Sequence, residues 1–452
     1  MMAVPKTTKN RLIGCDKMRE DVKERMRNRE AGLTPTGYRY YHKVGTFPSD
    51  WKVKLLRELS VQVTEKVGKR KLETLSISAG VGFANQAQKF GKELSGKQYV
   101  KYTVLRRGDF SYNKGNSNMY PQGCIYCLQD REIAAVPDVF NSFRLRDEQC
   151  NIDFYSHLFI AGIMNHQLFP KINSGVRNDG LLNLYTDDFY GCTLPVPSLP
   201  EQQKIAEILN HCDKVIELNR QLIEEERNRK KWFIRNLLEP GAKVRLPGFS
   251  GEWTRCILGD ICSINGRIGF RGYSVDDLVE ENAGAISLSP SNISNGNMNF
   301  DHSTYISWEK YEESPEIKVR QGDILFVKTG STFGKCAKVA FLPKEATINP
   351  QLAIIRAKNV NTDYLAHLLS SNLVQNRVQQ VVVGGAVPTL SQEQIYRLEI
   401  AIPSLEEQTA ISVILNNSDC IINSLEQKLA QWQLKKKALS QLLLTGLVRV
   451  TA

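Results

Sequence analysis

The sequence predicts an α+β protein in which two similar globular domains alternate with two long helices. Three observations predict it: a gap-free internal repeat, a heptad pattern in both copies of the repeat, and matching landmarks in the blocks between them. Residues 194–238 and 400–444 align without a gap at an offset of 206 residues. A repeat of this length constrains the architecture before any site is considered.

Each copy of the repeat opens with a helix-start pattern. Ser198-Leu199-Pro200-Glu201 and Ser404-Leu405-Glu406-Glu407 have the S-x-x-E form of a capping box. In such a box the serine accepts from a first-turn N–H and the glutamate reaches back to the cap residue. The pattern therefore predicts two helices of about 34 residues, each roughly 50 Å long.

The apolar residues that follow each start are spaced four, three, four, three, which is the heptad of a coiled coil. Neither helix can bury this seam alone, so we expect an antiparallel pair with a domain at each end. The alternative is two unrelated helices, each packed on its own domain. The predicted helix-pair interface residues are Ile205, Leu209, Ile216, Ile223, Phe233, Leu237, Ile411, Leu415, Ile422, Leu425, Leu429, Trp432 and Leu439.

The blocks before the helices carry matching landmarks. Arg106-Arg107-Gly108-Asp109 parallels Arg320-Gln321-Gly322-Asp323, and short apolar runs such as 324–327 and 352–355 indicate strands. The chain ends on Val448-Arg449-Val450, which matches Val244-Arg245-Leu246 before the second block, so we expect a circular, pseudo-twofold repeat. The predicted parts are an arm (1–45), a first domain (46–193), a central helical region (194–245), a second domain (246–398) and a C-terminal helical region (399–452).

Composition limits the partners. The net charge is +11, but residues 1–45 carry +6 of it and the second domain carries −1, so charge alone supports nucleic-acid binding only weakly. The sequence has no run of 18 apolar residues, so we expect no membrane span, and the N-terminal residues lack the apolar core of a signal peptide. Ten scattered cysteines suit a reducing cytosol, and we expect a cytoplasmic protein.

The candidate chemical motifs are weak. Cys124 and Cys127 form a C-x-x-C without a second ligand pair, so no metal site is predicted. Gly330–Cys336 resembles a phosphate loop but is one residue short and lacks its metal-binding hydroxyl. A turn that brings Lys335 near a DNA backbone is therefore favoured over ATP binding, and a plain surface turn is the other alternative. His157 and His367 are interpreted as packing residues. We predict no cofactor and no catalytic constellation, which favours a recognition or scaffold protein.

At the paired helix starts, Pro197–Gln202 and Pro403–Gln408, and at the R-x-G-D segments, the chain resembles the specificity subunit of type I DNA restriction-modification systems. The resemblance covers roughly residues 46–450. It implies two α/β target recognition domains, each reading half of a split DNA site, with the helix pair as spacer. It also implies two docked methyltransferase subunits and endonuclease-translocase subunits in the full complex. The arm, with the charged stretch 16–30, lies outside the repeat and is either a helix or a disordered leader.

The family varies its base-reading residues, so candidates come from side-chain chemistry instead. Arg, Lys, Asn and Gln distinguish base edges in the major groove. The predicted DNA-contact residues lie on Gly-, Asn- and Ser-rich loops beside the repeated strands. They are Asn85, Gln86, Lys89, Tyr112, Asn113 and Lys114 in the first domain, and Asn292, Asn295, Lys328, Thr329, Ser331, Thr332 and Lys335 in the second. Two alternatives stay open: a DNA-modifying enzyme, and a coiled-coil scaffold without DNA contact.

Overall fold

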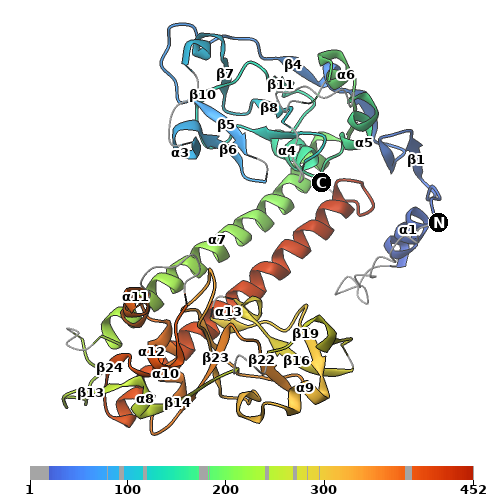
Figure 1. Ribbon diagram of the computed structural model, residues 1–452. Coiled ribbons are helices and arrows are strands. Elements are labelled where there is room, and N and C mark those ends of the chain that lie inside the picture. Colours follow the sequence, from blue (N-terminus) through green and yellow to red (C-terminus); the bar gives the residue numbers. More distant parts are fainter. Residues whose placement is uncertain are drawn as a thin grey trace. The chain divides into compact units, whose positions relative to one another are not determined.

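The computed structural model describes residues 20–450 except 79, 91–95, 116–119, 173–181, 183, 240–243, 268–271, 282, 295 and 382–388. The chain divides into two compact units (Figure 1). Unit 1 comprises residues 1–218 and 429–452, and unit 2 comprises residues 219–428. The long helices α7 (Leu199–Leu237) and α13 (Leu405–Leu443) each have 39 residues and contribute to both units. The two predicted helices are therefore present and slightly longer than expected.

Unit 1 is built around a four-stranded antiparallel sheet in the order β4-β11-β8-β9. Phe110 and Phe143 are fully buried on adjacent strands of it, and their rings stack with centroids 5.4 Å apart. The sheet strands are β4 (Ser60–Gln62), β8 (Phe110–Asn113), β9 (Cys124–Cys127) and β11 (Asn141–Leu145). Antiparallel pairs around it are β1 (Tyr38–Tyr41) with β2 (Gly45–Pro48), β3 (Lys52–Leu55) with β12 (Thr193–Val196), β5 (Leu75–Ser78) with β6 (Gly82–Asn85), and β7 (Thr103–Arg106) with β10 (Ile133–Val136).

Unit 2 contains a four-stranded antiparallel sheet in the order β14-β23-β20-β21, and a second sheet in the order β15-β19-β16-β22. The predicted strand at 324–327 is confirmed as β20, and the one at 352–355 lies within β23. The first sheet consists of β14 (Cys262–Gly266), β20 (Ile324–Val327), β21 (Cys336–Lys338) and β23 (Leu352–Ala357). The remaining strands are β13 (Thr254–Ile257), β15 (Leu278–Val279), β16 (Gly284–Leu288), β17 (Ile293–Ser294), β18 (Asn297–Met298), β19 (Thr304–Ser307), β22 (Ala346–Ile348) and β24 (Glu399–Ile402).

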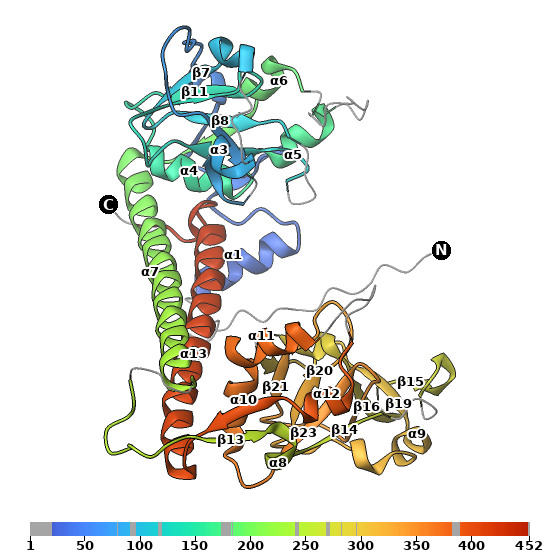
Figure 2. The same cartoon turned by 60° about the vertical axis from the view of Figure 1, so that its left-hand side comes forward.

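Short helices occupy matching places in the two units. Asn151 caps α4 and Asn361 caps α10, each by accepting from the backbone N–H three residues later. Figure 2 shows α10, α11 and α12 grouped beside the sheet of unit 2. The short α-helices are α2 (Leu56–Leu59), α3 (Gln86–Phe90), α4 (Ile152–Ile160), α5 (Asn165–Leu168), α6 (Thr186–Tyr190), α8 (Leu258–Ile261), α9 (Trp308–Glu312), α10 (Thr362–Ser370), α11 (Asn372–Val381) and α12 (Gln392–Tyr396). Both units contain strands and helices, which confirms the predicted α+β class.

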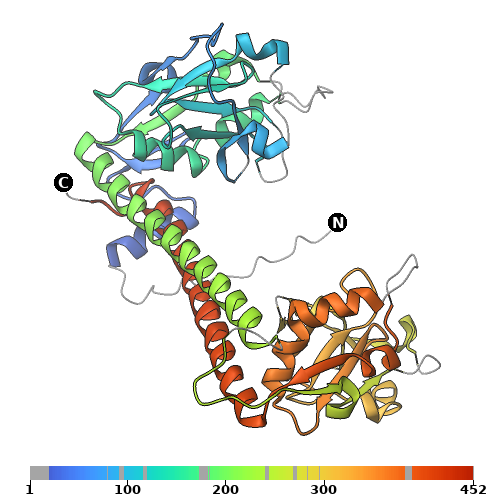
Figure 3. The same cartoon turned by 90° about the vertical axis from the view of Figure 1, so that its left-hand side faces the viewer.

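Each end of the long helices belongs to the core of one unit. In unit 1, Ile205 and Leu209 of α7 join one buried cluster with Leu443 of α13. Figure 3 shows these helix ends, α7 in green and α13 in red, beside each other at unit 1. In unit 2, Ile411 and Leu415 of α13 join a buried cluster with Leu237, Leu258 and other residues of that unit. The seam residues thus stabilise the units as well as the helices.

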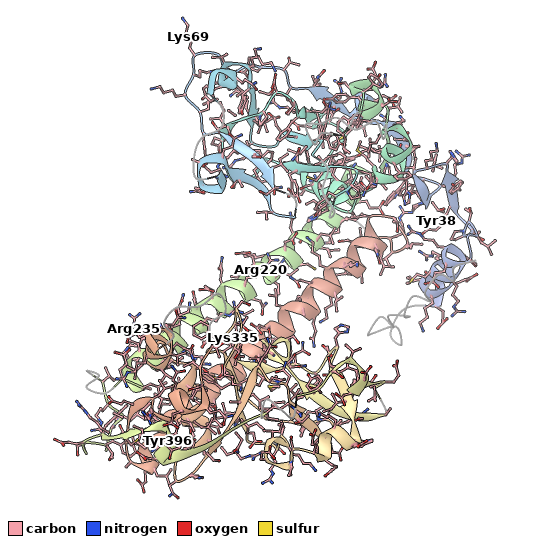
Figure 4. All side chains as sticks on the ribbon, in the orientation of Figure 1. Tyr38, Lys69, Arg220, Arg235, Lys335 and Tyr396 are labelled. Atoms are coloured by element: carbon pink, nitrogen blue, oxygen red, sulfur yellow. The ribbon has the colours of Figure 1, made fainter. Side chains whose placement is uncertain are left out.

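The structure describes the basic arm from Glu20 onward. Helix α1 (Glu20–Glu30) corresponds to the helical alternative for the charged stretch, and residues 1–19 lie outside the described part of the chain. Arg25 donates to the carbonyl oxygen of Leu447 at 2.7 Å, and the hydroxyl of Tyr38 donates to that of Gly446 at 2.6 Å. Figure 4 labels Tyr38 on this segment. The arm is therefore attached to the C-terminal segment of the same unit.

Candidate nucleic-acid interface

The R-x-G-D segments are turns that position the strands carrying the candidate residues. In unit 1 the segment links β7 to β8, and its glycine, Gly108, has a φ of +89°. Asp109 is fully buried and accepts from the backbone N–H of Arg106 at 2.7 Å and from Arg144 at 2.6 and 2.9 Å. Because these partners satisfy the carboxylate, the turn fixes where β8 begins.

Unit 2 repeats this arrangement. Gly322 has a φ of +93°, and Asp323 accepts from the backbone N–H of Arg320 at 2.8 Å. Arg356 donates to both carboxylate oxygens of Asp323 at 2.8 and 3.0 Å. Such bidentate, charge-assisted contacts hold a strand in register more firmly than single neutral hydrogen bonds. The strand that follows, β20, leads directly to Lys328.

A lysine follows β8 in unit 1 and β20 in unit 2, and in both units it lies five residues after the buried aspartate in the sequence. Lys114 comes directly after β8, and Lys328 directly after β20. The backbone of each is held by a returning segment: Leu182 donates to the carbonyl oxygen of Lys114 at 2.9 Å, and Leu390 to that of Lys328 at 2.8 Å. Both side chains are partly buried. The structure therefore gives both predicted lysines equivalent places in the two units.

The glycine-rich segment of unit 2 is the turn between β20 and β21. Gly330 and Gly334 have φ values of +109° and +86°, which favour glycine. Lys335 and Ser331 are exposed on this turn, Thr332 is half-buried, and Thr329 forms an isolated bridge with Thr389. Figure 4 labels Lys335. This is a strand turn of the kind expected from the sequence.

Three predicted contact residues are buried and are used inside their units. Tyr112 stacks on Phe189 with centroids 4.6 Å apart, and its hydroxyl donates to the carbonyl oxygen of Gln122. Gln86 donates to the carbonyl oxygen of Leu75. Asn292 accepts from the backbone N–H of Ser289 in a turn. Since less than 5% of each side chain is exposed, we remove these three from the proposed DNA surface.

Two further candidates also have internal partners. Asn85 donates to Glu73 at 2.9 Å, and Asn113 donates to the carbonyl oxygen of Ile77 at 3.3 Å. Both side chains stay partly exposed. Asn295 and the side chain of Lys89 lie outside the described part of the structure. Lys114, Lys328 and the 329–335 turn therefore stay predicted DNA contacts.

Reciprocal ion pairs join the long helices within each unit. In unit 1, Lys436 of α13 pairs with Asp213 of α7. In unit 2, Lys230 of α7 pairs with Asp419 of α13. In the repeat, Asp213 corresponds to Asp419 and Lys230 to Lys436, so this ion pair of one unit has its counterpart in the other with the helices exchanged.

The seam residues are the less exposed face of both helices. Eight of the predicted interface residues are at most 8% exposed: Ile205, Leu209, Ile216, Ile223, Leu237, Ile411, Leu415 and Ile422. Phe233, Leu425, Leu429, Trp432 and Leu439 are half-buried. The seam of α7 is thus buried near the start of the helix and again at Leu237 near its end, where the helix joins the core of unit 2.

The predicted capping boxes form only in their serine half. Ser198 and Ser404 accept at 3.4 Å from the backbone N–H groups of Glu201 and Glu407. The glutamates do not turn back but bind arginines from the segments that follow the other helix. Glu201 accepts from Arg449 at 2.8 Å and from Trp51 at 3.0 Å, and Glu407 accepts from Arg245 at 3.0 Å. A distant cation outcompetes the local contact because a charge-assisted pair in a buried place is the stronger interaction.

The two repeated histidines link the short helices to the long ones. The Nε2 atom of His157 lies 2.8 Å from Asn210 Oδ1, and that of His367 lies 2.9 Å from Asn416 Oδ1. Burial lowers the pKa of both histidines, although the asparagine hydrogen bonds act in the opposite direction. Both are packing residues, as predicted.

These histidines predict acid sensitivity. The unfolded chain takes up protons near the ordinary histidine pKa of about 6.5, whereas the folded chain does so only at lower pH. Folding free energy is therefore lost as the pH falls below about 6.5. We expect the urea midpoint to drop between pH 7.5 and pH 5.5, and the drop to shrink in the His157→Gln, His367→Gln double variant. An unchanged drop in that variant would assign the effect to other groups.

Two polar residues near Lys328 were not predicted. Gln351 precedes β23 and Gln392 begins α12, so both are distant from Lys328 in the sequence. Only their position in a strand pair and a short helix brings them close, and no sequence motif marks them. The roles of Arg144 and Arg356 as partners of the buried aspartates were also not predicted, although each arginine follows its R-x-G-D segment at a similar distance in the sequence.

Other motifs are structural in the described part of the chain. Cys124 and Cys127 lie on β9, and burial raises the pKa of Cys127 to about 12. No group of three or more His, Cys, Asp or Glu side chains suited to a metal ion occurs among the described residues. Across the same residues, no helix combines the length and apolar character needed to cross a membrane.

Comparisons with known proteins agree with this architecture. The family described as "Type I restriction modification DNA specificity domain" matches residues 113–225 and 251–432, more than half of the chain. The putative type I restriction enzyme MjaX specificity subunit of Methanocaldococcus jannaschii is 23% identical over 431 residues, covering 90% of this chain and 96% of that protein. The EcoR124I/EcoR124II specificity subunit of Escherichia coli is 24% identical over 246 residues, covering 52% of this chain and 57% of its own.

Solved structures show the same fold. The crystal structure of the type I restriction-modification S subunit from M. genitalium covers 93% of this chain and 100% of its own, with a TM-score of 0.54 and 13% identity. A chain from a study of complex assembly and conformational transition in a type I system covers 89% of this chain and 99% of its own, with a TM-score of 0.52 and 15% identity. At these identities the likeness concerns the fold alone.

Proposed function

Because this chain belongs to the family of type I restriction-modification DNA specificity subunits, we propose that each of its units reads one half of a split, asymmetric DNA target. Subunits of this family recognise DNA sequence and are not catalytic; the catalytic activities lie in other subunits of the complex. The proposal concerns which parts of this chain read DNA and what the helices contribute.

One observation carries the proposal: two units have the same scaffold but different surfaces. Each has a four-stranded sheet whose strands follow the same chain order, a buried aspartate paired with an arginine, and a lysine after the central strand. The loops around that lysine differ in length and composition. A shared scaffold with different loops fits two different half-sites, and hence an asymmetric target.

We propose that α7 and α13 pair antiparallel and set the gap between the half-sites through a pseudo-twofold arrangement of the units. The exchanged ion pairs Asp213–Lys436 and Asp419–Lys230 support it, as does the continuity of both helices through the points where the units divide. Half-site spacing is a geometric property of the protein that holds the readers. The predicted boundaries at 46–193 and 246–398 then define the two target recognition domains.

We further propose that the outward faces of these helices dock two methyltransferase subunits, and that endonuclease-translocase subunits complete the complex. Apolar side chains that both helices leave exposed are the basis for this placement, because they offer a partner apolar surface to bury. They are Leu218, Leu222 and Trp232 of α7, and Val413, Ile421 and Leu434 of α13.

A matched heptad insertion tests the spacing. Seven residues added after Leu218 and seven after Lys428 would keep the seam in register and lengthen both helices by about 10 Å. Because base pairs are about 3.4 Å apart, we expect the methylated target to keep both half-sites while its gap grows by about three base pairs. Methylome sequencing of cells carrying the chain and its methyltransferase measures this directly.

The control is the same seven residues inserted in the 246–250 segment, outside the helices, which should leave the gap unchanged. A lengthened helix pair that still methylates the original target would contradict the spacing role. A wild-type target without a gap would contradict the bipartite reading itself.

A further inference from the structure

Lys328 of unit 2 is held in place on both sides of its backbone. Its N–H donates to the carbonyl oxygen of Gln351 at 2.8 Å, and its carbonyl oxygen accepts from Leu390 at 2.8 Å. The residue follows β20 directly, whose four residues are all buried. The side chain therefore leaves the sheet from a defined point.

The described residues supply no counter-charge to Lys328. Among the described residues, no carboxylate lies within ion-pair distance of its ammonium group, and burial lowers its pKa. By contrast, four other lysines of unit 2 each pair with a carboxylate: Lys230, Lys310, Lys318 and Lys338. A partly buried cation without a counter-charge is costly unless a ligand supplies acceptors.

One amide group lies close to this ammonium group. A Cβ atom added to Gly266 would lie 2.6 Å from Gln392 Nε2 and 3.3 Å from Lys328 Nζ, so both polar ends converge over that glycine. A second amide, that of Gln351, belongs to the residue paired with the Lys328 backbone, and its Nε2 would be 3.5 Å from a Cβ at Gly330. Its Oε1 accepts from Asn349 at 3.0 Å, which orients the amide. The cluster thus offers a cation and two amides over two glycines that leave room for a close approach.

This combination matches the edge of a base pair in the major groove. Guanine presents two acceptors there, O6 and N7, and lysine is one of the side chains that contacts both. A glutamine beside it can donate to or accept from the neighbouring base. A phosphate needs only the cation, so the oriented amides favour a base edge over the backbone.

Unit 1 has the lysine without the amides. Lys114 stands at the place of Lys328, but Thr186 begins α6 where Gln392 begins α12. At the register of Gln351, before the strand that pairs with the central one, unit 1 has Val139. A constant lysine with different neighbours is what two different half-sites require.

We infer that Lys328, Gln392 and Gln351 form the base-reading cluster of unit 2, in which Lys328 donates to O6 and N7 of a guanine. This inference rests on the proposed function, because it assigns a base contact within the half-site that unit 2 reads. Exposed Lys335, on the adjoining turn, is the matched comparison for a lysine that contacts only the backbone.

The test compares Lys328→Met with Lys335→Ala in the assembled complex with the methyltransferase partner. Methylome sequencing gives the target motif, and binding to duplexes over a salt series gives the affinity. For Lys328→Met we expect discrimination at one G·C pair of one half-site to fall by about 5- to 100-fold, with the other half-site unchanged. For Lys335→Ala we expect the motif to persist while affinity falls for all sequences and the salt slope decreases by about one.

Gln392→Ala is a second test that keeps the charge of Lys328. We expect this variant to weaken the sequence preference at the same base pair or at the adjacent one. A Lys328→Met complex with an unchanged motif and a uniform loss of affinity would overturn the inference, since that result describes a phosphate contact. An unchanged motif with unchanged affinity would overturn it too.

If Lys328→Met fails to assemble, Lys328→Arg replaces it. A retained preference for guanine in that variant supports the inference. Loss of the preference in a folded Lys328→Arg protein contradicts the inference. A wild-type motif without two half-sites would instead refute the proposed function.

Discussion

The Arg356→Ala variant is expected to lose about 3–5 kcal/mol of the folding free energy of unit 2, because it leaves a buried carboxylate without its cation. The Asp323 side chain is 5% exposed and receives both contacts from Arg356. The guanidinium also donates to the carbonyl oxygens of Lys318 and Glu316, at 2.6 and 3.3 Å. Those acceptors would lose a partner at the same time.

Hydrogen exchange measured by mass spectrometry separates the two units in this experiment. Exchange should rise throughout β20 and β23 in the Arg356→Ala protein, while peptides of unit 1 keep their protection. The surface variant Arg397→Ala is the control. Its ion pair with Glu393 is 74% and 63% exposed, so we expect a change within about 0.5 kcal/mol.

A second substitution tests the cause. Asparagine at position 323 removes the buried charge but can still accept from the backbone N–H of Arg320, so Asp323→Asn combined with Arg356→Ala should be more stable than Arg356→Ala alone. If the double variant is less stable, the loss comes from the contacts of Arg356 with the backbone and not from the stranded charge. The equivalent change in unit 1, Arg144→Ala, should move the damage to that unit.

The long helices could be predicted because their signals are local and repeated. In each copy of the repeat, the serine that starts the helix and the heptad pattern that follows lie within one continuous stretch of sequence. The hydrogen-bond partners of Glu201 and Glu407 could not be predicted, because the arginines that bind them lie 248 and 162 residues away in the sequence. A local pattern such as the capping box shows which groups compete for a contact, and the tertiary structure decides which group wins.

The candidate site was predicted unevenly for a similar reason. Lys114 and Lys328 follow a repeated turn and strand, so their equivalence is visible in the sequence. Tyr112, Gln86 and Asn292 share the loop-like composition of surface residues, and composition does not report burial. Gln351 and Gln392 come from elements that are distant in the sequence, and their approach to Lys328 depends on strand pairing.

The Leu415→Asp variant is expected to unfold unit 2, whereas Val413→Asp should be nearly neutral. Leu415 is fully buried in the core cluster of unit 2, and Val413, two residues earlier on the same helix, is 52% exposed. Truncating a buried leucine costs about 2–5 kcal/mol, and an unpaired buried carboxylate adds to that loss. The sum approaches the whole stability of a typical domain, about 5–15 kcal/mol. Limited proteolysis and hydrogen exchange of the purified chain measure the outcome.

The repeat-related variant Leu209→Asp makes this result specific. Leu209 is also fully buried, but in the core of unit 1. If each helix end is part of the core of a unit, Leu209→Asp should expose unit 1 to protease and Leu415→Asp should expose unit 2. If the helices served only as a spacer, either change would separate the helix pair and leave both units folded. Protection that is lost in one unit at a time would therefore mean that each helix end stabilises the unit whose core it joins.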